Sequence, residues 1–231
     1  MKLSVESLFE AVYRHYPRNI AVDDDLYKAS EEYQRLAAAR RSAGTGEQRE
    51  IWYAFLRRVD ERLSPAIVQN MSLHLPTGAH DAGYIGHVFL PDAEGRTRPT
   101  IGLLISFLVP CYLLYRWHVE LREPDPAMVA SAAASRTFFL GDTMYVVKLD
   151  HPAARFIPPT VFGPQLHSVE GLDFFPEERP HADWLAQEIQ KTWGAEPMPP
   201  EIGRLVVPDI ALGSRRLGEA TLYDCLFTDQ R

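Results

Sequence analysis

The spacing of apolar residues changes near Pro65, and this change constrains the fold more than any other feature of the sequence. Before Pro65, apolar side chains recur every three or four residues, as on one side of an α-helix. After it, apolar and polar side chains alternate, as on a half-buried β-strand. We therefore expect a single α+β domain over residues 1–231, with a helical part over 1–66 and a sheet-containing part over 67–231.

Three helices are expected in the helical part, and the first two have recognisable ends. The first starts after Ser4, a favourable N-cap residue, and stops at Pro17, which cannot continue a helix. The second runs over about 26–42, after three aspartates at 23–25 that stabilise the positive end of a helix dipole. Its apolar side begins with Leu26.

The third helix has both a start signal and a continuous apolar stripe. Thr45 and Gln48 have the spacing of a capping box, in which each side chain bonds to the other residue's backbone. The stripe predicts five core residues: Trp52, Phe55, Leu56, Val59 and Leu63.

The alternating segments predict a mainly antiparallel sheet against which the helices pack. The strands are expected at 67–75, 84–90, 101–109, 113–121, 143–149, 204–210 and 220–227. In the first of them Ile67 and Met71 share one face, with Asn70 and Ser72 on the other. The segment 101–109 is apolar on both sides, which predicts a central strand covered on both faces.

The C-terminal third should contain one further helix and the last two strands. Residues 150–180 are rich in Pro, Gly and aromatic residues and lack a clean period, so we expect a long packed loop there. The helix that follows places Trp184 and Trp193 on one side and ends at Gly194.

Negative charge is concentrated in one part of the sequence. The 31 acidic and 24 basic residues give a formal charge of −7, whereas residues 1–66 carry 11 of each and are neutral. The segment 170–201 alone carries eight acidic and two basic residues. This charge is either a solvated face or a patch that binds a basic protein, and it argues against nucleic acid as a partner.

Aromatic residues lie among these carboxylates, which is typical of protein interfaces. The candidate partner-binding residues are Glu170, Asp173, Phe174, Phe175, Glu177, Glu178, Asp183, Trp184 and Glu188.

No motif predicts catalysis, a cofactor or a metal. The chain has no phosphate-binding loop and no GxSxG elbow. The densest histidine group is His74, His80 and His87 with Asp81, and its spacing matches no known set of metal ligands. We therefore expect no catalytic residues, no metal and no cofactor.

The chain is expected to be cytoplasmic and not inserted in a membrane. Two glutamates interrupt any apolar stretch near the N-terminus, unlike a secretory signal. The 17 uncharged residues at 99–115 include Pro110 and fit strands better than a spanning helix. Cys111 and Cys225 form no CxxC pair and are expected to be reduced, buried thiols.

Three parts of the sequence together resemble bacterial immunity proteins encoded beside polymorphic or type VI secretion toxins. They are LFEAVYRHYPRNI with YKASEEYQRL and WYAFLRRV, then ISFLVPCYLLYRW, and last VPDIALGSRRLGEATLYDCLF. The resemblance implies an inhibitor that binds a cognate toxin, and within this group it points to inhibitors of restriction-endonuclease-like nuclease toxins. It supplies no motif residues.

The expected function is therefore an immunity protein that neutralises a toxin by stoichiometric binding. A nuclease has a basic substrate cleft, for which an acidic inhibitor can compete with DNA. Two alternatives remain open. One is an enzyme of unfamiliar type, a hydrolase that uses the region of His74 and His87, and the other is an adaptor protein of a secretion system.

Overall fold

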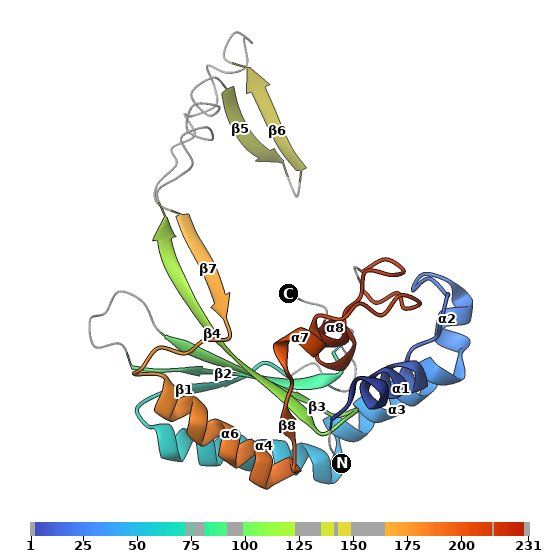
Figure 1. Cartoon of the computed structure of the whole chain (residues 1–231). Coiled ribbons are helices and arrows are strands. Elements are labelled where there is room, and N and C mark those ends of the chain that lie inside the picture. Colours follow the sequence, from blue (N-terminus) through green and yellow to red (C-terminus); the bar gives the residue numbers. More distant parts are fainter. Residues whose placement is uncertain are drawn as a thin grey trace. The chain divides into compact units, whose positions relative to one another are not determined.

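The computed structural model gives the chain as two compact units (Figure 1). The first comprises Met1–Trp117 and Glu170–Arg231, and the second His118–Val169. The structure describes residues 3–72, 75, 81–91, 99–122, 135–140, 143–148, 165–213 and 215–228.

The expected change from helices to strands occurs between Leu63 and Ile67. The N-terminal helices are α1 (Val5–His15), α2 (Asp25–Ala29), α3 (Glu31–Gly44) and α4 (Gly46–Leu63). Ser4 caps α1 by accepting a hydrogen bond from the Ser7 N–H at 3.2 Å, as predicted. The α+β class is confirmed.

The second expected helix is in fact two helices, α2 and α3. Ser30 separates them because its backbone is extended and its hydroxyl accepts the Tyr33 N–H, which makes it the N-cap of α3. Asp24 caps α2 in the same way through the Leu26 N–H. Leu26, expected on the apolar side, is 64% exposed.

The capping box predicted at the start of α4 is not formed. The Thr45 side chain makes no capping bond and instead donates to the Arg41 carbonyl at 2.6 Å. The apolar stripe of α4 is nevertheless correct, because all five predicted core residues are buried.

The main sheet has the strand order β1-β2-β3-β4-β7, with the short β8 pairing in parallel with β4. Neighbours from β1 to β4 are antiparallel. The strands are β1 (Ile67–Asn70), β2 (Gly83–Phe89), β3 (Thr100–Ser106), β4 (Cys111–Arg122), β7 (Gln165–Gly171) and β8 (Glu196–Pro197). Every residue of β3 is buried, which confirms the predicted central strand.

Helices cover both faces of this sheet in the first unit. On one face, α4 and α6 (Arg179–Trp193) pack on alternate residues of β3, including Ile101 and Leu103 (Figure 1). On the other face, α1 and the C-terminal segment pack on residues such as Leu104 and Cys111. The α6 helix ends at Gly194 in the left-handed conformation, as predicted.

The side of β1 that faces the core is the one that carries Val68 and Asn70. Ile67 is 52% exposed and Met71 is also exposed, so these two apolar residues face outward. Asn70 faces inward because its Oδ1 accepts hydrogen bonds from the Trp52 Nε1–H at 3.1 Å and the Ser72 N–H at 2.9 Å. A buried indole N–H requires such a partner, and Val68 on the same side of β1 packs against the core as well.

The segment expected as a long loop contains β7. The two strands expected after α6, at 204–210 and 220–227, do not form. Val206 and Thr221 make one isolated bridge, and the chain forms two short helices, α7 (Pro200–Gly203) and α8 (Leu222–Leu226).

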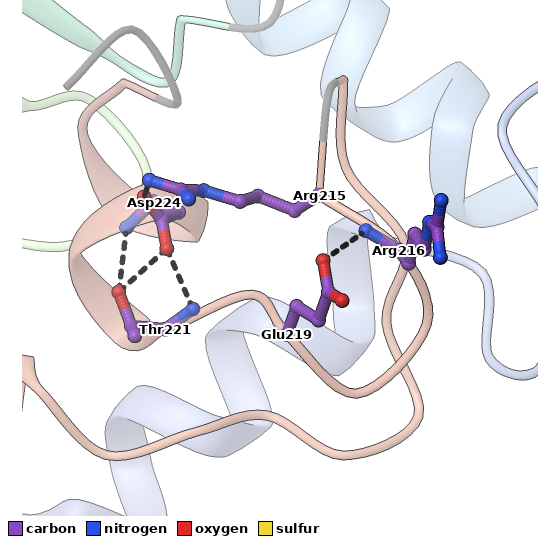
Figure 2. A network of polar contacts seen from close by, with 5 residues as sticks. All are labelled: Arg215, Arg216, Glu219, Thr221 and Asp224. Carbon is purple, nitrogen blue, oxygen red and sulfur yellow. Dashed lines mark hydrogen bonds and ion pairs between the residues drawn. The ribbon is translucent and has the colours of Figure 1, made fainter.

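A capping box explains why the last segment is helical. The Thr221 hydroxyl accepts the Asp224 N–H at 3.3 Å, and the Asp224 Oδ2 accepts the Thr221 N–H at 2.8 Å (Figure 2). Arg215 Nη2 lies 3.6 Å from the Asp224 Oδ1. These bonds satisfy backbone N–H groups that have no partner within the helix. The alternation of apolar residues does not reveal such a helix start.

The second unit contains one antiparallel pair of strands. They are β5 (Ser135–Leu140) and β6 (Thr143–Lys148), with Leu140 opposite Thr143. The strand expected at 143–149 corresponds to β6.

The two cysteines are free and buried, as expected. Burial raises the pKa of both thiols. Across the described ranges, no helix has the length and apolar character needed to cross a bilayer.

Candidate partner-binding site

The candidate site begins at the turn that joins β7 to α6. Here Phe175 is 48% exposed, which is unusual for a large aromatic side chain. The guanidinium of Arg116, on β4, lies over its ring, with the Arg116 Cζ 3.9 Å from the ring centroid. This cation–π contact holds an exposed apolar ring in one orientation.

Glu178 holds the same turn from inside. The residue is 1% exposed, and its Oε2 accepts the Phe175 N–H at 3.0 Å. The Phe175 carbonyl in turn accepts the N–H groups of Glu178 and Arg179, both at 3.0 Å. Glu178 was expected to contact a partner, but this enclosed position gives it a structural role in the turn.

Three predicted carboxylates remain exposed around the turn. They belong to Asp173, Glu177 and Asp183. None of the three forms an ion pair with another described residue. The Arg116 guanidinium keeps its positive charge against the Phe175 ring, and among the described residues it forms no ion pair with any of the three. Their negative charge therefore remains available to a partner.

Glu188 joins two helices and does not face a partner. It is buried, and its Oε1 accepts a hydrogen bond from the Arg58 Nε at 2.6 Å. Arg58 also donates to the Thr192 Oγ1 at 2.8 Å, and so links α4 to α6. The charge of Glu188 is compensated inside the first unit.

The two other predicted aromatic residues pack inward. Phe174 and Trp184 are partly buried against the core between α4, α6 and the sheet. Glu170 lies in β7, and its side chain is outside the described residues. The candidate residues that are exposed in this turn and at the start of α6 are Asp173, Phe175, Glu177 and Asp183, and we call them the Phe175 surface.

Sequence reasoning missed the importance of Arg116 for this surface. Along 113–121, Arg116, His118 and Glu120 alternate with apolar residues, which predicts a solvated position for Arg116. Its contact with Phe175 joins residues 59 positions apart, and no local pattern in the sequence indicates such a pair.

The histidine group does not form a described metal site. His74 and His80 lie outside the described residues. His87 is partly buried, and its Nε2 lies 3.0 Å from the Tyr115 hydroxyl. Burial lowers the pKa of His87. In the described part of the chain, no three His, Cys, Asp or Glu residues are placed to bind a metal ion together.

Comparison of the chain with protein-family models, with curated proteins and with solved structures found no match.

Proposed function

We propose that this protein is an immunity protein that binds and neutralises a cognate antibacterial toxin in a one-to-one complex. The toxin is a nuclease with a basic surface. The observation that carries the proposal is the Phe175 surface, where an exposed aromatic ring held against Arg116 accompanies three exposed carboxylates that form no ion pair within the described part of the chain.

This arrangement has the composition of a binding hot spot. Aromatic anchors that are already held in place lose little conformational freedom when a partner covers them. Carboxylates around an anchor attract a basic partner and raise its association rate. The resemblance of the sequence to immunity proteins agrees with these properties.

The first experiment is co-expression with the toxin encoded beside this protein. We expect the two chains to elute together in size-exclusion chromatography, with a mass by light scattering that corresponds to one copy of each. Nuclease activity should fall to zero at an equimolar ratio. Neutralisation by catalytic amounts would contradict the proposal and favour the hydrolase, and a failure to protect cells would favour the adaptor.

Two matched triple variants test the surface itself. Asp173→Lys, Glu177→Lys and Asp183→Lys together should slow association about tenfold or more at low salt. The control reverses three exposed acidic residues of α4 and changes the net charge equally: Glu50→Lys, Asp60→Lys and Glu61→Lys. Equal slowing by both variants would show that overall charge acts rather than this surface.

A further inference from the structure

An apolar groove opens beside the Phe175 surface, between β4, α6 and the start of α7. Its volume is about 260 Å³. Leu114, Leu172 and Phe174 contribute apolar side chains, Ala186 lines it from α6, and Pro200 lines it from α7.

The groove and the Phe175 surface are continuous. Phe174 lines the groove, whereas the next residue, Phe175, is exposed and has the Arg116 guanidinium against one side of its ring. Because Glu178 fixes the turn that carries both rings, the two apolar surfaces are held together. A partner that covers Phe175 therefore meets the groove at the same time.

The groove has acidic residues in and next to its lining, and the basic Arg116 lies beside it, against Phe175. Asp183 is the one charged residue among those that line it in the described part of the chain. Asp173 lies between the lining residues Leu172 and Phe174, and Glu201 follows the lining residue Pro200. Both carboxylates are exposed. An apolar interior with one acidic residue in its lining, and two more that adjoin lining residues in the sequence, complements an apolar side chain that has a positive neighbour.

The size of the groove indicates what it can hold. Sites for drug-sized ligands and cofactors usually measure roughly 300–1,000 Å³. At about 260 Å³ the groove falls just below this range, and its lining offers one charged group. These dimensions suit a single large side chain of a protein better than a cofactor.

We infer that the groove binds one large apolar side chain of the toxin, next to lysine or arginine in the toxin sequence. The inference rests on the proposed function and adds the chemistry of the segment that the toxin presents. The apolar side chain fills the groove, and its basic neighbours lie against Asp173, Asp183 and Glu201.

The test measures binding of the purified toxin to variants of the groove by biolayer interferometry. Ala186→Trp fills the groove and should raise Kd about 30-fold or more, mainly through faster dissociation. Gln187→Trp, which places the same ring on the exposed side of α6, should change Kd less than about threefold. Thermal unfolding of each variant confirms that it is folded.

A second pair of variants tests the charge and keeps the experiment informative if Ala186→Trp fails to fold. Pro200 is exposed at the mouth of the groove. Pro200→Lys should weaken toxin binding, whereas Pro200→Glu should maintain or strengthen it. A purely structural role for Pro200 would give the same loss in both variants and would overturn the inference.

The remaining outcomes separate this inference from the proposed function. If the wild type binds the toxin and Ala186→Trp binds it equally well, the groove is not used, although the proposed function stands. If the wild type does not bind the toxin, both fail. Sedimentation of the free protein gives one more result: a dimer that Ala186→Trp converts to a monomer would make a second copy the occupant and overturn the inference.

Discussion

Glu177 and Glu178 are adjacent glutamates for which the structure predicts opposite behaviour. Glu177 is exposed, whereas Glu178 is enclosed and accepts the Phe175 N–H at 3.0 Å. Glu178→Ala should lower the free energy of unfolding of the first unit, because an amide of the turn loses its acceptor. Glu177→Ala should leave it within about 0.5 kcal/mol of the wild type.

The size of the Glu178 effect follows from two contributions. A hydrogen bond to a charged acceptor contributes about 1.5–3 kcal/mol, and a negative charge at a helix start adds about 0.3–1 kcal/mol. The hydrogen bond from the Phe175 N–H to Glu178 is only partly buried. In the variant, water can therefore bond to this N–H and restore part of the lost free energy. We therefore expect a loss of about 2 kcal/mol for Glu178→Ala and about half of this for Glu178→Gln, which keeps an acceptor.

Urea unfolding followed by tryptophan fluorescence measures this difference. All four tryptophans belong to the unit that contains the turn. With a denaturant slope of about 2 kcal/mol per molar, the midpoint of Glu178→Ala should fall by about 1 M. Identical midpoints for Glu178→Ala and Glu177→Ala would refute the structural role of Glu178, as would a greater loss in Glu177→Ala.

Three further predictions concern stability. In a double-mutant cycle measured by urea unfolding, Arg58→Ala and Glu188→Ala should show a coupling free energy of about 1–2 kcal/mol. If the two losses of stability simply add in the double variant, the bond between these residues is contradicted. Burial lowers the pKa of His87 in the folded protein, so protonation of this residue favours the unfolded chain. The free energy of unfolding should therefore fall as the pH drops below about 6.5, the ordinary pKa of histidine in an unfolded chain. It should level off once the pH is below the lowered pKa of the folded state. His87→Gln should flatten this decline in thermal melts, and an unchanged profile would assign the decline to other groups. Gly102→Ala would place a methyl group against the ring of Tyr115 and should lower the free energy of unfolding by about 1–3 kcal/mol. A urea midpoint equal to that of the wild type would exclude this close approach.

The sequence predicted the features that depend on long periodic patterns. The apolar stripe of α4 and the two-sided burial of β3 are correct because each depends on many residues with the same spacing. The facing of β1 could not be predicted in this way. The strand is four residues long, and the inward position of Asn70 depends on the Trp52 indole N–H, a partner from α4.

The C-terminal segment shows how a short local signal can override alternation. Residues 220–227 alternate well enough to suggest a strand, yet Thr221 and Asp224 have the spacing of a capping box. In the structure this box starts α8. The alternation over 220–227 predicts a strand, whereas the cap predicts the helix that the chain forms there.

Of the candidate site, the sequence could predict the charge and the aromatic residues but not their exposure. Glu178 and Glu188 differ from Glu177 only through their partners in the fold, which are a backbone amide of the turn and Arg58 on α4. Phe175 remains 48% exposed, and the contact that covers part of its ring comes from Arg116 on β4. Each of these contacts, apart from that of Glu178, joins residues that are distant in the sequence.

The exposure of these residues also determines how the proposed complex should respond to salt. Of the predicted carboxylates with described side chains, Asp173, Glu177 and Asp183 remain exposed, and the exposed face of α6 also carries Arg179 and Lys191. Long-range attraction is therefore weaker than the segment's total charge suggests, so the association rate should depend only moderately on ionic strength. The residence time should depend mainly on burial of apolar surface at Phe175 and in the groove, which salt hardly weakens. Raising the salt concentration should consequently slow association of the wild type while leaving its dissociation rate almost unchanged.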